Sequence, residues 1–330
     1  MAKHHRFCKA KPPTIPNERK AFETKAMVIT MKNKKIYILG SLNMDLVISS
    51  PYMPVAGETV KGGGFTMNPG GKGANQAAAC GKLGGDTVMA GCVGDDLFGR
   101  ELLGTLSAHN VDVSRIRKVD GSSGIAVIVL AEGDNRIILD AGANAKTCKN
   151  DVEVLLSDAE AGDIFLTQLE NPTETVGEAL IAAKAKGLLT VLNPAPWNDR
   201  IKPYLSYVDI MTPNETELAL ASGTDDIEKG LSGLLERGVG QIVVTLGGDG
   251  YRIFDREKDV KGECMKVDVV DTTAAGDTFN GAMVAELSRG VDIESAAAFA
   301  SRCASLACTR LGAIRSIPER EEVNGMQNAE

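Results

Sequence analysis

The stretch Lys35-Ile36-Tyr37-Ile38-Leu39-Gly40 predicts a buried β-strand that ends in a loop, because a short apolar run is broken by a glycine. Similar compact runs recur at 87–93, 164–168, 188–193, 208–211, 241–246 and 267–270. Stretches with the apolar spacing of helices lie between them, at 97–109, 172–186, 226–237 and 276–289. Because strands and helices alternate, we expect a doubly wound α/β fold, with a mostly parallel central sheet covered by helices on both faces.

Four early segments do not fit this alternation, since they come in pairs too close together for helical crossovers. They read as short strands at 45–50, 58–65, 124–130 and 136–140. The intervening Glu132-Gly133-Asp134-Asn135 is a strong hairpin signal. We therefore predict a small second sheet, a lid formed by about 45–66 and 124–140, on a domain that spans 35–320. Residues 321–330 are predicted to form a C-terminal tail.

The charge of the chain is unevenly spread. The formal net charge is −8, yet residues 1–35 hold 10 Lys and Arg against two acids, which leaves the remainder strongly acidic. An acidic body and few aromatic residues (4%) argue against nucleic acid or a membrane surface as a partner.

The sequence contains no run of 18 apolar residues, so no membrane-spanning helix is predicted. Residues 1–34 lack the apolar core of a secretory signal and are predicted to be a disordered extension, although a transit peptide or a later start at Met27 or Met31 stays possible.

The scarcity of histidine restricts the chemistry. His109 is the only histidine outside the leader, which nearly excludes a Ser-His-Asp triad, a Cys–His pair or a His-rich metal site. The seven cysteines are scattered and form no C-x-x-C pair, as expected for reduced thiols in a cytoplasmic protein. Catalysis must therefore use carboxylates, amides, lysine and bound cations.

Polar residues follow nearly every predicted strand of the body. In such sheets the carboxyl ends of the strands meet at one rim, where ligands bind. The rim set comprises Asn43, Asp45, Glu170, Asn193, Asn214, Glu217 and the segments 247–250 and 271–277. We expect these residues to share one site.

Residues 68–76 (NPGGKGANQ) form a glycine-rich turn before an alanine-rich helix. Glycines let backbone amides approach a ligand closely. The segment is not a Walker A loop, because Lys72 precedes Gly73. No G-x-G-x-x-G occurs, which disfavours a nicotinamide enzyme. A plain helix-start turn is the simpler alternative.

Residues 271–277 (DTTAAGD) combine a base and an anion site at the start of a helix. Small residues before Asp277 leave successive amides free to hold a transferring phosphoryl group. Asp277 falls in the first turn, where it can act as general base toward a substrate hydroxyl or serve only as a helix cap. The pattern favours phosphoryl transfer to a hydroxylated substrate.

Asn214 and Glu217 stand three apart at a helix start, so they share a face. They can organise a hydrated Mg²⁺ or form a capping box, and the two readings are evenly matched. The strand and glycine turn at 245–250 suits a triphosphate tail.

On these motifs the chain resembles the ribokinase (phosphofructokinase-B) family of carbohydrate kinases over about 36–318. The segments 70–77 and 271–279 are similar to the two family signatures, and 40–45, 57–60, 168–170, 193–196 and 212–217 also match. The resemblance implies ATP-dependent phosphorylation of D-ribose at its 5-hydroxyl, giving D-ribose 5-phosphate and ADP. Deoxyribose, fructose, a nucleoside or another small sugar is the alternative substrate. A non-catalytic sugar-binding protein on the same scaffold is the alternative class.

The resemblance also implies a set of site residues. Asp277 acts as the base, with the amides of Ala275 and Gly276 near the phosphate. The ribose contacts are Asn43, Asp45, Gly71, Lys72, Gly73, Asn75, Glu170 and Asp277. The ATP contacts are Asn214, Thr245, Gly247, Gly248, Asp249, Gly250, Gly276 and Ser301, with Glu217 supporting Mg²⁺ indirectly. A K⁺ site is implied at Asp271, Thr273, Ala307, Arg310, Gly312 and Ser316, and a homodimer is implied through the lid sheet.

Overall fold

The computed structural model describes residues 33–327, which are built around a nine-stranded sheet in the order β13-β12-β11-β10-β9-β8-β1-β4-β5. Neighbouring strands are parallel except for the β11–β12 and β12–β13 pairs. The strands are β1 (Lys35–Leu39), β4 (Asp86–Gly94), β5 (Val111–Val119), β8 (Ile164–Thr167), β9 (Leu189–Leu192), β10 (Ile210–Met211), β11 (Gln241–Thr245), β12 (Tyr251–Phe254) and β13 (Asp259–Gly262). The predicted doubly wound, mostly parallel sheet is confirmed.

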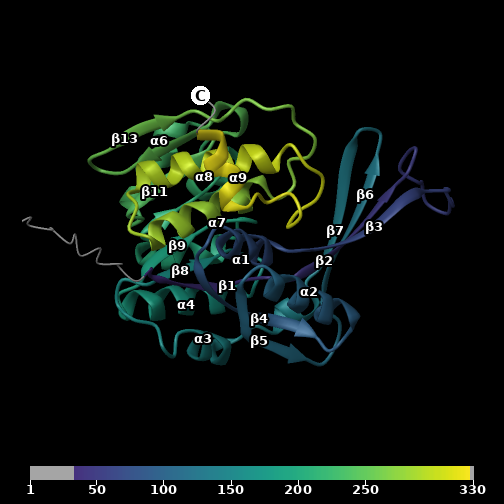
Figure 1. The fold of residues 1–330 in the computed structure, drawn as a ribbon, viewed down its shortest axis with the longest axis horizontal. Coiled ribbons are helices and arrows are strands. Elements are labelled where there is room, and N and C mark those ends of the chain that lie inside the picture. The colour runs from purple at the N-terminus through teal and green to yellow at the C-terminus, as the bar shows by residue number, and fades with distance from the viewer. Residues whose placement is uncertain (1–32, 328–330) are drawn as a thin grey trace, which may run out of the picture. The chain divides into compact units, whose positions relative to one another are not determined.

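Helices cover both faces of this sheet (Figure 1). One face packs against α1 (Lys72–Lys82), α2 (Leu97–Ala108), α7 (Ala275–Ser288), α8 (Ile293–Ala307) and α9 (Arg320–Gln327). The other packs against α3 (Lys149–Leu155), α4 (Thr173–Ala185), α5 (Glu215–Ser222) and α6 (Ile227–Glu236). Short 3₁₀ helices occupy η1 (Gly142–Lys146), η2 (Asp199–Tyr207) and η3 (Gly247–Asp249).

Strand β1 shows why both faces are buried. Ile36 and Ile38 join the core on the side of α1 and α7, whereas Tyr37 and Leu39 join the core on the side of α4. Successive side chains of a strand point to opposite faces, so a continuous apolar run needs a cover on each side. The continuous apolar sequence at 35–40 therefore requires that β1 lie inside the sheet, where it is flanked by β8 and β4.

The lid is a separate four-stranded sheet in the order β3-β2-β6-β7, extending away from the helical body (Figure 1). Its strands are β2 (Asn43–Ser49), β3 (Gly63–Gly70), β6 (Gly124–Ala131) and β7 (Asp134–Asp140). The second strand was predicted at 58–65, but it lies later and reaches Gly70, because its ladder with β2 pairs Asn43 with Gly70. The glycine-rich turn is thus a direct continuation of a lid strand.

One further prediction of local structure, a strand at 267–270, is wrong. Residues 267–270 form no strand, and Val269 and Val270 are exposed; the amide of Val270 instead donates to the carbonyl of Cys308. Alternating valines mimic a strand, but no neighbouring strand is there to pair with them. The predicted tail at 321–330 contains most of α9, which is anchored by buried Val323. The predicted extension falls almost wholly on 1–32, outside the described residues.

Across residues 33–327 no helix has both the length and the apolar character needed to cross a bilayer.

Helices α1 and α7 approach each other closely because residue 281 has no side chain. A Cβ at Gly281 would lie 2.5 Å from the Cβ of Ala79 and 2.6 Å from the carbonyl oxygen of Gln76. The thiol of Cys80 also donates to the carbonyl of Gly281, at 3.3 Å. This packing sets the distance between the start of α1 and the start of α7.

We predict that Gly281→Ala lowers the free energy of unfolding by about 1–3 kcal/mol, since the added methyl group overpacks this contact. Gly104→Ala in α2 is the matched control, because a Cβ at Gly104 would meet no atom within 4 Å and alanine favours helix there by about 0.5–1 kcal/mol. Urea unfolding of both variants measures the difference. Equal stability of the two variants would contradict the close approach.

Candidate active site

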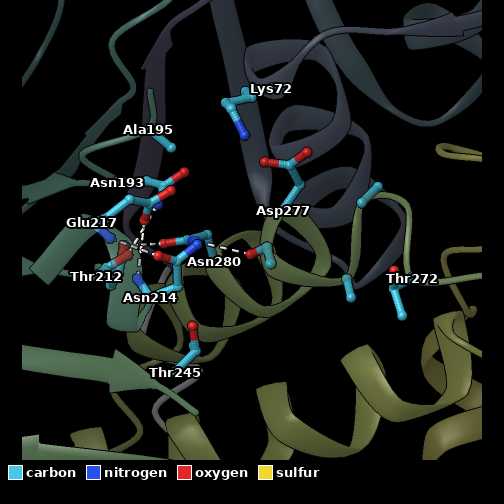
Figure 2. Close-up of a pocket in the computed structure, with 13 residues that line it drawn as sticks. Lys72, Asn193, Ala195, Thr212, Asn214, Glu217, Thr245, Thr272, Asp277 and Asn280 are labelled. Atoms are coloured by element: carbon cyan, nitrogen blue, oxygen red, sulfur yellow. Dashed lines mark hydrogen bonds between the residues drawn. The ribbon is translucent and has the colours of Figure 1, made fainter. Parts of the chain in front are cut away.

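A cleft of about 210 Å³ opens at the carboxyl ends of β9, β10 and β11, against the start of α7 (Figure 2). Predicted site residues on its wall are Lys72, Asn214, Glu217, Thr245, Ala275, Gly276 and Asp277. The wall also includes Asn193, Thr272 and Ala274, which belong to the predicted rim set, and Ala195, Thr212 and Asn280, to which no ligand role was assigned. The parallel strands thus bring distant motifs to one rim, as their topology requires.

The start of α7 supplies an anion-binding turn. Ala274 precedes the helix in the left-handed conformation (φ 61°), and the amide of Ala275 donates to the carbonyl of Thr272. The next amides, those of Gly276 and Asp277, belong to the first helical turn and have no acceptor within the helix. Since the positive end of the helix dipole lies here, the turn suits a phosphoryl group.

Asp277 is buried at the third helical position, with 7% of its surface exposed. Its Oδ2 accepts a hydrogen bond from Asn75 Nδ2 and its Oδ1 accepts one from Gln76 Nε2, each at 2.9 Å. Figure 2 shows the Lys72 side chain reaching toward this carboxylate across the cleft. The carboxylate is therefore fixed by two amides at the edge of the cleft, and it is not a helix cap.

The glycine-rich turn is held by Ser41 and Glu170. Glu170 Oε2 accepts from the Ser41 hydroxyl at 2.5 Å and from the Lys72 amide at 3.1 Å, and Ser41 Oγ accepts from the Gly73 amide at 3.2 Å. Glycine is required at Gly71, whose φ is 92°, and at Gly73, where a Cβ would lie 2.5 Å from Gly40 Cα. Glu170 thus shapes the turn that sequence patterns assigned to sugar binding.

Negative charge gathers beside this turn. Burial, together with the nearby carboxylates of Glu170 and Asp277, raises the pKa of Asp45 to about 7. Burial disfavours the Lys72 ammonium, but Asp277, Glu170 and Glu217 outweigh that effect and raise its pKa. The Lys72 ammonium therefore stays charged among these carboxylates, where a phosphate or sugar hydroxyl can also reach it.

Asn43 is nearly fully buried and is oriented by Asn144, a residue that sequence patterns missed. Asn144 Nδ2 donates to Asn43 Oδ1 at 2.8 Å and to the Leu42 carbonyl at 3.0 Å, while its Oδ1 accepts from the Leu42 amide at 2.9 Å. Asn144 lies in η1, about a hundred residues away in sequence. A lone asparagine in the alanine-rich stretch 141–145 offers no recognisable sequence signal.

Asn214 and Glu217 form the capping box at the start of α5. Asn214 Oδ1 accepts from the Glu217 amide at 2.8 Å, and Glu217 Oε2 accepts from the Asn214 amide at 2.9 Å. Both side chains also line the cleft, and burial raises the pKa of Glu217 despite the opposing effects of the Asn214 amide and Lys72. The structural role of the pair is thus observed, and it leaves one carboxylate oxygen available to the cleft.

The remaining residues predicted to contact the nucleotide are not on the cleft wall. Gly247–Asp249 form η3, and Gly250 ends it with φ 92°. Buried Ser301 donates to the Glu263 carbonyl at 3.3 Å. Asn43, Asp45, Gly71, Gly73, Asn75 and Glu170 likewise lie beside the cleft rather than on its wall.

Three of the predicted cation residues meet where the 271–273 segment contacts the loop after α8. Asp271 Oδ1 accepts from the Thr273 amide and Oδ2 accepts from the Gly312 amide, both at 2.9 Å. Burial opposes these hydrogen bonds, which together lower the pKa of Asp271. Arg310 pairs with Glu322, its amide donates to the Ala307 carbonyl, and Ser316 donates to the Ala313 carbonyl. Among residues 33–327, no cluster of three or more His, Cys, Asp or Glu suits a metal ion.

Four buried polar side chains connect the site although no role was assigned to them: Gln76, Gln168 and Thr212, which lie within the motif segments 68–76, 168–170 and 212–217, and Asn280. Thr212 Oγ1 donates to Asn280 Oδ1 at 2.5 Å, and Asn280 Nδ2 donates to the Gly276 carbonyl at 2.8 Å. Asn280 stands one turn after Gly276 on α7, and this i,i+4 spacing is the only signal that points to it.

Comparison with known proteins gives consistent matches. The model of the pfkB family of carbohydrate kinases matches residues 33–320. Ribokinase of Bacillus subtilis is 40% identical over 88% of this chain and 98% of its own length. Deoxyribokinase of Salmonella typhi is 33% identical over 88% of this chain and 97% of its own length. The structure of Arabidopsis thaliana ribokinase complexed with ribose and ATP matches with a TM-score of 0.83 at 31% identity, covering 89% of this chain and 98% of that one.

We predict that Asp45→Asn changes how stability depends on pH. In the folded chain Asp45 holds its proton up to about pH 7, whereas in the unfolded chain it ionises near pH 4. The folded state thus binds the extra proton between these values, so the wild-type stability falls as pH rises through that window. Asp45→Asn, which cannot ionise, should lose less stability there and be the more stable protein at pH 8.

Urea unfolding at intervals from pH 4.5 to pH 8 measures this dependence. Asp134→Asn is the control, because Asp134 is an exposed residue at the β6–β7 turn of the lid. Parallel stability curves for the wild type and Asp45→Asn would contradict the prediction.

Proposed function

This chain belongs to the pfkB family of carbohydrate kinases, and we propose that it transfers the γ-phosphoryl group of ATP to the 5-hydroxyl of D-ribose, giving D-ribose 5-phosphate and ADP. The proposal rests mainly on one observation: the Asp277 carboxylate is fixed by two amides at the anion-binding start of α7, at the edge of the cleft. The ribokinase of B. subtilis and the ribose- and ATP-bound structure of A. thaliana ribokinase support the same reaction.

Asp277 is the general base in this proposal. A carboxylate can accept the proton of a sugar hydroxyl as that oxygen attacks phosphorus. The free amides of the first turn of α7 and the Lys72 ammonium lie beside it and offset the charge on the phosphoryl oxygens. Because Gly276 and Asp277 are both present, a catalytic role fits better than a sugar-binding role alone.

ATP and Mg²⁺ fit the side of the cleft formed by Asn214, Glu217 and Thr245. These side chains offer amide, carboxylate and hydroxyl oxygens, and Mg²⁺ takes oxygen ligands while keeping several waters. Magnesium supplies charge neutralisation between the phosphates when bound. The glycines of 247–250 and Ser301 complete the proposed nucleotide contacts.

Ribose is assigned to the region between the glycine-rich turn and the base of the lid. The proposed contacts are Asn43, Asp45, Gly71, Lys72, Gly73, Asn75 and Glu170. A sugar offers several hydroxyls, each a donor and an acceptor, and this set offers carboxylates, amides and backbone N–H groups. Asn75 Oδ1 is buried and has no hydrogen-bond partner within the described chain, so it is open to a hydroxyl donor.

Potassium is proposed as an activator at Asp271, Thr273, Ala307, Arg310, Gly312 and Ser316. Main-chain carbonyls are the usual ligands that replace the water around K⁺. The hydrogen bonds from Thr273 and Gly312 to Asp271 tie the 271–273 segment to the loop after α8, directly before the anion-binding turn. A cation there would make the electrostatic potential at the anion-binding turn more positive, which favours the negatively charged phosphoryl group.

The second candidate is the same reaction on deoxyribose, since a deoxyribokinase is 33% identical over most of the chain. The two sugars differ by one hydroxyl, and a site that hydrogen-bonds this group discriminates strongly against its absence. Fructose, nucleosides and other small sugars remain further alternatives. We also propose a cytoplasmic location, which the six unpaired cysteines of the described chain support.

We predict that wild-type protein turns over D-ribose faster than 2-deoxyribose, fructose or nucleosides, and that K⁺ raises the rate. Asp277→Asn should bind ribose normally but lose about 10³-fold in kcat, because the base is removed while the amide contacts remain. A coupled assay of ADP release, run with and without K⁺, measures both effects. Calorimetry measures ribose binding to the variant.

Faster turnover of another sugar would replace ribose as the substrate and leave the kinase assignment intact. Near-normal turnover of Asp277→Asn would refute the base. Equal rates with and without K⁺ would remove the cation from the proposal.

A homodimer through the lid sheet is proposed as the assembled form. One sheet cannot bury its own apolar face, and one face of this lid exposes Phe65, Met67 and Ile138, whereas Ile137 and Leu139 are exposed on the opposite face. An exposed apolar patch of this kind marks an interaction surface. A second copy of the chain presents the same patch, as a two-fold dimer requires.

We expect Ile138→Asp to shift the protein from dimer to monomer, because a charge would be buried without a partner. Val154→Asp is the control, since Val154 is exposed on α3, away from the lid. Sedimentation velocity measures the oligomeric state. A wild-type monomer, or an Ile138→Asp dimer, would count against a lid interface.

A further inference from the structure

We propose that Gln76, itself oriented by Gln168, is a positioning residue that fixes the carboxylate plane of the base Asp277. The inference rests on the role proposed for Asp277. It concerns two glutamines on different elements, α1 and the residue that follows β8. Neither lies on the cleft wall, so each acts on the reaction only through the base.

Gln76 is fully buried, and every polar atom of its amide has a partner. Its Nε2 donates to Asp277 Oδ1 at 2.9 Å and to Asn193 Oδ1 at 3.0 Å. Its Oε1 accepts from Gln168 Nε2 at 2.6 Å. An amide bound on three sides cannot rotate without losing buried hydrogen bonds.

The orientation of the Gln76 amide follows from the chemistry of its partners. An ionised carboxylate only accepts hydrogen bonds, so the NH₂ group of Gln76 must face Asp277. The opposite end of the amide is then an acceptor, and Gln168 supplies the donor. Gln168 is itself buried, and its Oε1 has no partner in residues 33–327. The hydrogen bonds are therefore donated in one direction: Gln168 donates to Gln76, and Gln76 donates to the carboxylate of the base.

Asn75 holds the other oxygen of the same carboxylate, at 2.9 Å. Two amides on adjacent positions of α1 thus clamp Oδ1 and Oδ2, and each oxygen keeps a second lone pair for a substrate hydroxyl. Proton transfer needs the base within hydrogen-bond reach and correctly oriented, and a misplacement of about 1 Å can cost on the order of 10²-fold in rate. Gln76 therefore contributes to kcat without contributing to ligand affinity.

A purely structural role for Gln76 makes a different prediction. Gln76 would then stabilise the contact between α1, β9 and α7, and its loss would lower stability whatever the state of residue 277. A positioning role instead requires that the effect on kcat disappear when the base is absent. The two roles are separated by epistasis with Asp277.

The central variant is Gln76→Met, which keeps the length of the side chain and removes its donor. We expect kcat to fall on the order of 10- to 100-fold, with unchanged KM for sugar and unchanged Kd for ATP. In the Asp277→Asn background the same change should lower the residual rate no further. Gln168→Met should give a smaller fall, and adding it to Gln76→Met should have no further effect, because Gln168 acts through Gln76.

Gln241→Met is the matched control. Gln241 Nε2 also donates to a carboxylate, Asp255 Oδ2 at 2.5 Å, but at β11 and away from the cleft wall. Its kcat should equal that of the wild type. If Gln76→Met fails to fold, Gln168→Met and its combination with Asp277→Asn carry the same test.

The assays use full-length protein and the sugar with the highest wild-type kcat/KM, so a wrong choice of sugar does not affect them. A fall in kcat that persists undiminished in the Asp277→Asn background would overturn the positioning role alone. A rise in KM with kcat unchanged would also overturn it. Normal turnover by Asp277→Asn would instead refute the proposed base, a separate failure.

Discussion

The active site depends on the close approach of α1 to the first turns of α7. Because Gly281 has no side chain, Ala79 and the Gln76 carbonyl of α1 pack directly against the α7 backbone. Any side chain at residue 281 would push the two helices apart. The approach brings Asn75 and Gln76 to the Asp277 carboxylate, although these residues lie about 200 positions apart in the chain. The proposed base is thus positioned by helix packing rather than by a loop. The absence of a side chain at residue 281 is therefore a condition for the chemistry proposed at the N-terminus of α7.

Several residues of the site have structural and functional roles at once. Glu217 caps α5 and lines the cleft. Glu170 shapes the glycine-rich turn, and its negative charge also helps to raise the pKa values of Lys72 and Asp45. The capping box predicted for the Asn214–Glu217 motif is observed, and it is compatible with the Mg²⁺ role proposed for the pair. A capping hydrogen bond fixes one carboxylate oxygen and leaves the other free, so the cap orients the group that a ligand would meet.

The sequence predicted those features that local patterns encode. The run at 35–40 identified the central strand, because only a strand covered on both faces is apolar throughout, and the close spacing at 124–140 identified the lid hairpin. Its failures have a common cause. The valines at 267–270 have no strand beside them, and β3 continues through Pro69 because β2 pairs with it. Gln76, Gln168 and Asn144 act only through contacts across the fold, which periodicity does not record.

The pairing of Asn43 with Gly70 has a mechanical consequence. Two of the lid strands reach the proposed sugar region. Strand β2 begins there at Asn43, and β3 ends there at Gly70, directly before the turn that holds Lys72. A hydrogen-bonded ladder is stiff along its length, so tilting the outer part of the lid displaces both ends together. The position of the outer lid therefore bears directly on the geometry of the proposed sugar region, to which the paired backbone of β2 and β3 leads.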